Sequence, residues 1–350
     1  KALQKILSQV IAGAKELKNE KFGRFELSVA LAIKYFQEQK AEIGVIEVGI
    51  GGRFDSTRIF RGPVTVLTSL DLEHTDLLGS TKEAIGYEKL DLADPNSKVV
   101  LGNLPAELIP KLKAYGKLNN LHLRSVMEIV DGKILSESAT KLICSFEHSD
   151  FHLPEVTIPL GGHFQQINLQ MALLASFLYL QNRNRWPGEA KFSSMVTEGL
   201  AHLRWEGRFQ QVTTDPVIFI DAGHTGEAMK CLRETVRQTM PHQRILLLLG
   251  ISFNKNKSAI LDEILPVAQE IICTQALHHG EKVELLEPMI RKSVSEVPLF
   301  CIPDVREALV FAKEKACAQG MTILVAGSLF LSIEVVTLLR GQDPKELRFL

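Results

Sequence analysis

Three side chains of different chemistry follow one another in the first part of the sequence. Glu47 lies near the end of the apolar run 43–48, His74 lies in a polar stretch, and Lys89 lies in the segment after it. The run 43–48 is short, apolar and followed by glycines, which is typical of a buried parallel strand. Ligands of open α/β sheets bind beyond the carboxyl ends of such strands. A carboxylate, an imidazole and a lysine at that edge favour a site for a divalent cation and phosphate.

Each of these residues also has a simpler interpretation. Glu47 fits a solvated carboxylate, His74 a helix cap or surface imidazole, and Lys89 a solvated helix lysine. One carboxylate and one histidine supply only part of the octahedral shell of Mg²⁺. We therefore expect the missing ligands to come from a phosphate-loop hydroxyl and from a nucleotide.

A glycine-rich loop, 49–53, directly follows the predicted strand. Gly51 and Gly52 carry no β-carbon, so their backbone N–H groups can approach an anion closely. The same glycines equally fit a tight turn, and both interpretations stay open at this point. Asp55 and Thr57 add polar groups to the loop.

A second group of polar residues lies beyond the middle of the chain. Asp221 and His224 end an apolar run and open a helical segment, which places them at the carboxyl edge of a second predicted sheet. Asp221 fits a role in holding a ribose hydroxyl or in orienting Arg208, and His224 fits a phosphate contact. The alternative is a helix N-cap by Asp221 beside an exposed histidine.

Composition excludes several classes of protein. The chain has 350 residues and a formal net charge of −1, and it contains no long basic run, so nucleic acid is not the expected partner. No stretch is apolar over the length of a bilayer crossing, so no membrane association is expected. The five cysteines are scattered without a Cys-x-x-Cys pair, which favours reduced thiols in the cytoplasm.

The hydrophobic pattern predicts an α/β protein with two domains. Parallel strands alternating with helices are expected in both, with an antiparallel patch at about 120–160. The rhythm restarts after residue 210, which predicts domains 1–203 and 204–350. The expected helices are 2–18, 24–39, 81–90, 166–182 and 191–203; the expected strands are 43–48, 64–69, 98–101, 217–220, 244–250, 270–274, 298–302 and 321–326.

Several motifs in their order resemble the folylpolyglutamate synthase/dihydrofolate synthase family of the Mur ligase superfamily. EVGIGGRFDST (47–57) is similar to that family's strand and loop, and LEHTDLLGSTKEAIGYEK (72–89) to its histidine loop and lysine helix. The resemblance extends over nearly the whole chain. The remaining matches are FQQIN (164–168), EGRF (206–209), DAGH (221–224) and AGSLFLSIEV (326–335).

The resemblance implies an ATP-dependent ligase that adds L-glutamate to a folate or dihydropteroate carboxylate through an acyl phosphate. It implies a Mur ligase central domain followed by a Rossmann-like C-terminal domain, and a monomer in the cytoplasm. ATP and Mg²⁺ are the implied cofactors, with a carbamylated Lys89 facing a second metal ion as one option. The implied roles are metal ligands for Glu47 and His74, nucleotide contacts for Gly51, Gly52, Asn168, Arg208 and Asp221, and catalysis for Lys89 and His224.

The sequence also departs from the family pattern. The family opens with a strand and a phosphate loop, and no G-x-x-x-x-G-K-[ST] occurs here, so we expect that segment upstream of Lys1. Arg58 and Thr225 stand where the family has asparagines. Asn254 and Asn256 replace the acidic residues around a lysine, and His278–His279 replaces a proline–arginine pair. Two alternatives follow: a non-catalytic paralogue that binds a ligand or partner, and a Mur-type ligase with another acceptor.

Overall fold

The structure is a computed structural model that describes residues 2–17, 22–60 and 62–348. Packing divides the chain into two compact units. The first contains the residues up to Ile129 together with Met171–Trp186, and the second contains Val130–Gln170 and the residues from Pro187 onward. These units follow backbone contacts rather than chain order, and the predicted domain boundary at 203/204 stays a prediction.

The first unit is built on a three-stranded parallel sheet in the order β1-β2-β3. Two helices, α4 and α5, bury apolar side chains against it, among them Ile85, Leu90 and Leu112, which are at most 1% exposed. Thr81 caps α4 by accepting the N–H of Ala84, which confirms the predicted start of this helix. The bounds are β1 (Val64–Leu67), β2 (Lys98–Leu101), β3 (His122–Ser125), α4 (Lys82–Leu90) and α5 (Ile109–Leu118).

Two helices at the amino end confirm the predictions for 2–18 and 24–39. They are α1 (Ala2–Glu16) and α2 (Arg24–Glu38), and residue 18 lies outside the described residues. Two short helical turns follow in the loops of this unit, η1 (Ser56–Ile59) and α3 (Thr75–Leu78), and α6 (Val126–Ile129) ends the first part of the chain.

Two strand predictions in this region are wrong. Residues 43–48 form no strand, and Val45 is 94% exposed. A buried strand needs hydrogen-bonding neighbours, and the described residues pair no strand with this run, so its apolar composition alone misled the prediction. The run LHLRSV (121–126) was expected in the antiparallel patch. It contains β3, which pairs parallel with β2, because its alternating pattern cannot reveal the direction of its partner.

The predicted antiparallel patch is present as a three-stranded sheet in the order β4-β5-β6. Its buried face carries Phe146, Phe151 and Leu153, each at most 2% exposed, and α8 packs on β6. The bounds are β4 (Asp131–Glu137), β5 (Leu142–His148), β6 (Phe151–Ile158), α7 (Phe164–Asn182) and α8 (Glu189–Ala201).

A six-stranded sheet forms the rest of the second unit, in the order β11-β10-β9-β12-β8-β7. All five predicted strands between 217 and 326 are present and parallel, and β7 is added antiparallel to β8 at one edge. The bounds are β7 (Gln210–Thr214), β8 (Val217–Ile220), β9 (Ile245–Leu249), β10 (Glu270–Cys273), β11 (Leu299–Cys301) and β12 (Thr322–Ala326).

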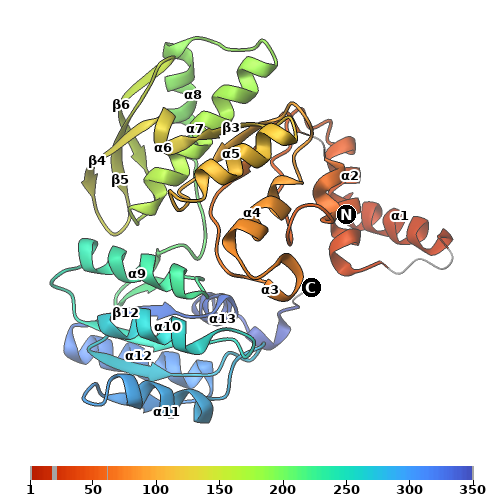
Figure 1. Ribbon diagram of the computed structural model, residues 1–350. Coiled ribbons are helices and arrows are strands. Elements are labelled where there is room, and N and C mark those ends of the chain that lie inside the picture. The colour runs from red at the N-terminus through yellow and green to blue at the C-terminus, as the bar shows by residue number, and fades with distance from the viewer. Residues whose placement is uncertain (1, 18–21, 61, 349–350) are drawn as a thin grey trace. The chain divides into compact units, whose positions relative to one another are not determined.

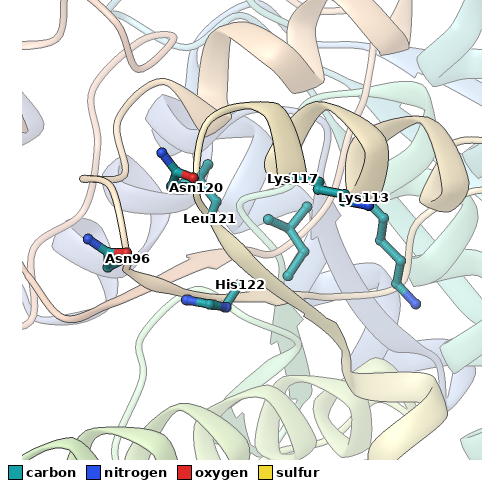
Figure 2. Close-up of a pocket in the computed structure, with 7 residues that line it drawn as sticks. Asn96, Lys113, Lys117, Asn120, Leu121 and His122 are labelled. Carbon is teal, nitrogen blue, oxygen red and sulfur yellow. The ribbon is translucent and has the colours of Figure 1, made fainter.

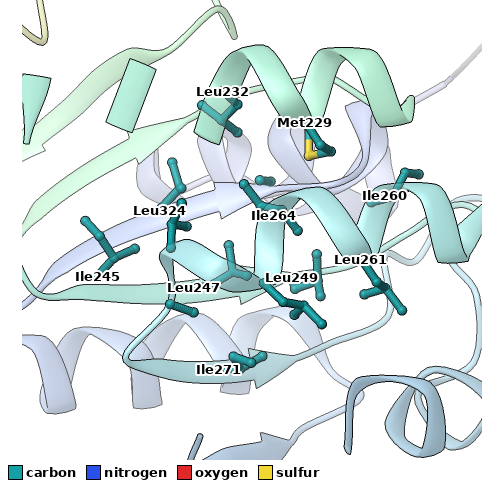
Figure 3. Packing of buried hydrophobic residues seen from close by; sticks show 14 of the residues in the cluster. Met229, Leu232, Ile245, Leu247, Leu249, Ile260, Leu261, Ile264, Ile271 and Leu324 are labelled. Carbon is teal, nitrogen blue, oxygen red and sulfur yellow. The ribbon is translucent and has the colours of Figure 1, made fainter. Parts of the chain in front are cut away.

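Helices cover both faces of this sheet, which explains why its five parallel strands are largely apolar (Figure 1). Leu247 and Leu249 point to the face covered by α9, α10 and α11, as Figure 3 shows for the first two helices. Leu246 and Leu248 point to the face covered by α12 and α13. The bounds are α9 (Gly226–Thr239), α10 (Lys257–Ile264), η2 (Leu265–Val267), α11 (Val283–Ser293), α12 (Val305–Gln319), α13 (Leu329–Leu339) and η3 (Pro344–Glu346).

Within the described part of the chain, every helix is too short or too polar to span a bilayer.

Candidate functional site

The loop that follows residue 48 takes its shape from Asp55. One carboxylate oxygen of Asp55 accepts the N–H groups of Gly49 and Ile50 at 3.0 and 2.9 Å, and the other accepts the N–H of Thr57 at 2.8 Å. The Thr57 hydroxyl also donates to Asp55. Asp55 therefore closes the loop and starts η1, so its carboxylate serves the backbone rather than a ligand.

The glycines of this loop lie where side chains would collide with neighbouring helices. Gly51 has φ +76°, and a β-carbon there would lie 2.8 Å from Leu78 in α3. A β-carbon on Gly52 would lie 2.6 Å from the carbonyl oxygen of Glu88 and 2.9 Å from Cα of Lys89. The loop thus packs on α3 and on the last turn of α4, which brings the segments carrying Glu47, His74 and Lys89 together.

An ion cluster that sequence reasoning missed holds the loop on α4. The Arg53 guanidinium donates to Asp91 through Nε at 2.7 Å and lies 3.5 Å from Glu88. Tyr115 donates to the other oxygen of Asp91 at 2.6 Å. Burial, followed by the bond to Asp91, raises the pKa of Tyr115, while Arg53 opposes that rise. The only sequence signal was an arginine directly after the glycine pair.

Glu47 and His74 both keep exposed side chains. His74 adopts a left-handed conformation, φ +51°, and its carbonyl oxygen accepts the N–H groups of Leu77 and Leu78. His74 occupies the N-cap position of α3, as the helix-cap interpretation expected, but its imidazole makes no capping bond. Lys89 is half-buried in the last turn of α4.

The donor set of this unit can hold Mg²⁺ only together with other oxygen ligands. Within the described ranges, no three His, Cys, Asp or Glu side chains gather as a metal site. Mg²⁺ commonly keeps several waters and binds through one or two carboxylates plus substrate phosphates. One carboxylate and one imidazole, both exposed, are compatible with such a partial shell.

Asp221 organises the candidate residues of the second unit. Its side chain is 6% exposed, and its two oxygens accept the N–H groups of Phe209 at 2.9 Å and Gly223 at 2.7 Å. Burial raises the pKa of the Asp221 carboxyl above its ordinary value, and these two bonds and the charges of Arg208 and His224 oppose the rise. These contacts favour the interpretation in which Asp221 positions the Arg208 turn.

Arg208 and His224 flank this carboxylate. Arg208 is exposed between Gly207, with φ +73°, and the buried Phe209, and the Gly207 carbonyl accepts the N–H of Ala222 at 2.8 Å. His224 Nδ1 lies 3.1 Å from the Ala222 carbonyl oxygen. Because a carbonyl only accepts, Nδ1 carries the proton and Nε2 is left to accept a proton or a hydrogen bond. The structure therefore brings Arg208, Asp221 and His224 together.

Asn168 lies in the first turns of α7. Its Nδ2 donates to Gln165 Oε1 at 2.9 Å. A β-carbon on Gly161, just before this helix, would lie 2.9 Å from the Phe209 ring, so the entry to α7 packs beside the Arg208 turn. Glu47, Gly51, Gly52, His74 and Lys89 belong to the first unit, whereas Asn168, Arg208, Asp221 and His224 belong to the second.

Sequence reasoning also missed a buried carboxylate in the second unit. Glu334 in α13 is 0% exposed, and it accepts the N–H groups of Leu277 and His278, each at 2.9 Å. His278 Nδ1 lies 2.9 Å from the same carboxylate. The pair His278–His279 therefore sits in a loop held by α13. A lone glutamate within the apolar run 329–339 was the available signal.

Comparisons with known proteins place these features in a family context. Residues 207–329 match the family model Mur ligase, glutamate ligase domain. The chain is 26% identical over 335 residues to the folylpolyglutamate synthase of Lacticaseibacillus casei, covering 91% of this chain and 72% of that protein. It is 25% identical over 334 residues to the dihydrofolate synthase/folylpolyglutamate synthase of Haemophilus influenzae, covering 89% and 72%.

A solved structure has the same fold. Mycobacterium tuberculosis folylpolyglutamate synthase, complexed with ADP and AMPPCP, matches with a TM-score of 0.81 over 95% of this chain and 76% of that chain. At 21% identity this similarity establishes the fold. The expected α/β architecture, a parallel sheet with an antiparallel patch followed by a Rossmann-like sheet, is therefore confirmed.

Proposed function

Since this chain is homologous to the folylpolyglutamate and dihydrofolate synthases, we propose that it is an ATP-dependent ligase that joins L-glutamate to a folate or pteroate carboxylate. The observation that carries the proposal is 26% identity sustained over 335 residues to a folylpolyglutamate synthase. The packing of the glycine loop onto the Lys89 helix supports it, because that packing gathers the predicted phosphate-site segments.

The reaction proceeds in two transfers. The acceptor carboxylate attacks the γ-phosphorus of ATP, and the bond between that phosphorus and the β,γ-bridging oxygen breaks. ADP departs, and an acyl phosphate is formed. The uncharged amine of glutamate then attacks the acyl carbon and loses a proton, and inorganic phosphate departs with the electron pair of the C–O bond. Catalysis of such transfers consists mainly of positioning and charge stabilisation.

The residues of the first unit serve the phosphate end of this reaction. Glu47 and His74 would hold Mg²⁺, which when bound would neutralise phosphate charge. Gly51 and Gly52 let the loop backbone approach an anion, and Lys89 supplies a positive charge or, as a carbamate, faces a second metal ion. Support comes from the shared packing of these segments and from the exposed side chains of Glu47 and His74.

The residues of the second unit serve the nucleotide and the amine. Asn168 contacts the adenine, and Arg208 binds phosphate from a turn that Asp221 holds in place. His224 offers Nε2 to a phosphate or to the proton released by the amine, because its Nδ1 proton is directed at Ala222. The hydrogen bonds that Asp221 accepts from the N–H groups of Phe209 and Gly223 support this positioning role.

We assign this activity to a cytoplasmic monomer. The five cysteines of the sequence are all free thiols, which is typical of a reducing compartment. They are spread along the sequence without a Cys-x-x-Cys pair, which also favours a reducing compartment.

The test is a coupled assay of phosphate release by the full-length protein with ATP, Mg²⁺, L-glutamate and either dihydropteroate or tetrahydrofolate. We expect release that needs glutamate and one of the two acceptors. Tight ATP binding without any release, with either acceptor, would instead identify a non-catalytic paralogue. Release with a different acid acceptor only would identify another Mur-type ligase.

A further inference from the structure

A hollow lies at the amino ends of two strands of the first sheet, beside the end of α5. It is an open hollow of about 450 Å³, a volume that a small organic ligand could occupy. Figure 2 shows the helix with its two lysines on one side and Asn96 and His122 on the other. The lining residues are Asn96, Lys113, Lys117, Asn120, Leu121, His122 and Leu123.

This hollow is separate from the candidate site. His122 begins β3 and Asn96 lies two residues before β2, so both mark the amino ends of parallel strands. His74 comes after β1 and thus follows a carboxyl end. No lining residue of the hollow belongs to the candidate site.

The lining is basic and contains no acidic residue. Lys113 lies 2.7 Å from Glu128, which neutralises its charge. Among the described residues, Lys117 and His122 have no acidic side-chain partner. Lys113 and Lys117 stand four residues apart on one helix face, so both ammonium groups lie on the same side of the hollow.

The polar side chains at the rim can complete an anion site. Asn96 and Asn120 both adopt left-handed conformations, φ +69° and +56°, and the Asn96 N–H donates to the Asn120 carbonyl oxygen at 2.6 Å. This bond fixes the two turns relative to each other, and each amide offers N–H donors. Leu121, which is 7% exposed, adds an apolar contact for a carbon skeleton.

We propose that this hollow binds a small organic polyanion, a compound carrying two or more phosphate or carboxylate groups. Lys117 and His122 supply charge and hydrogen bonds to one group, and the asparagine amides bind another. The proposal goes beyond the ligase function and does not depend on it.

Calorimetric titration of the full-length protein with tripolyphosphate and, separately, with citrate tests the proposal. We expect Lys117→Gln and His122→Ala each to weaken binding about tenfold, the effect of losing one charge-assisted hydrogen bond. Lys111→Gln is the matched control, because Lys111 lies on the same helix but outside the hollow and pairs with Glu83. The affinity of the Lys111→Gln variant for either probe should differ from that of the wild type by less than about twofold.

Lys89→Ala distinguishes the hollow from the candidate phosphate site. Binding that is lost in Lys89→Ala and kept in Lys117→Gln would overturn the proposal, as would the absence of heat with both probes. Equal losses in Lys111→Gln and Lys117→Gln would indicate diffuse charge attraction and would overturn it too. Preference for tripolyphosphate would assign a phosphate ester, and preference for citrate a polycarboxylate.

Discussion

Gly52 packs directly against the backbone of Lys89: a β-carbon at position 52 would lie 2.9 Å from the Lys89 Cα atom. The close approach joins the glycine loop to the helix that carries the proposed phosphate-site lysine. Arg53 reinforces it, since its N–H donates to the Glu88 carbonyl oxygen at 3.2 Å and its side chain pairs with Asp91. The contact between the loop and α4 therefore requires that position 52 carry no methyl group.

Replacing Gly52 by alanine should therefore destabilise the protein and disturb the site. Backbone atoms of Glu88 and Lys89 cannot move aside as a flexible side chain could, so we expect a loss of about 1–3 kcal/mol. Urea unfolding measures it, with Gly62→Ala as control, because a β-carbon there would meet only the Val64 carbonyl oxygen at 3.5 Å. An unchanged unfolding midpoint in Gly52→Ala would contradict the packing.

Glu47→Ala and His74→Ala should separate activity from stability. Both side chains are exposed, so we expect thermal unfolding to change little. Phosphate release should fall at least about a hundredfold, the scale seen when an electrostatic contribution to a transition state is removed. Glu42→Ala, another exposed glutamate nearby, should leave turnover unchanged. Turnover retained in Glu47→Ala would remove the metal assignment.

Much of the fold was predictable because its strands are buried on both faces. The run 245–249 is apolar at every position, the run 322–326 is apolar at every position after Thr322, and helices cover both sides of them. Residues 43–48 are also largely apolar, but no described strand pairs with them. Composition alone cannot predict whether an apolar run has a neighbouring strand. The site residues showed the same limit, since spacing could not distinguish the structural carboxylates of Asp55, Asp91 and Glu334 from ligands.

Asp221 should make stability depend on pH in a defined direction. Burial raises its pKa in the folded protein above the ordinary 3.8, so the folded state holds the proton more tightly than the unfolded chain. The contribution of Asp221 to unfolding free energy is thus largest below pH 3.8 and is lost as pH rises through the folded pKa. Asparagine does not titrate.

Urea unfolding of the wild type and Asp221→Asn at several pH values above 3.8 checks this prediction. The wild type should lose unfolding free energy relative to the variant as pH rises. A wild type that gains relative to Asp221→Asn over the same range would show that the hydrogen bonds from Phe209 and Gly223 outweigh burial.

Removal of the Glu334 carboxylate should be costly. Glu334→Ala removes the acceptor of two part-buried hydrogen bonds, from the N–H groups of Leu277 and His278, and an N–H group left unsatisfied costs about 1–3 kcal/mol. Glu334→Gln keeps one oxygen and should lose less. Glu314→Ala, at an exposed position of α12, is the control. Equal unfolding midpoints for Glu334→Ala and the control would argue against a structural role of this carboxylate.

Mass spectrometry of the acceptor, after incubation of the full-length protein with ATP, Mg²⁺, L-glutamate and dihydropteroate or tetrahydrofolate, tests the ligase function most directly. We predict a product that carries one added glutamyl residue in an amide bond, formed only when ATP and glutamate are both present. If folded protein leaves both dihydropteroate and tetrahydrofolate unchanged, that result would contradict the proposed activity.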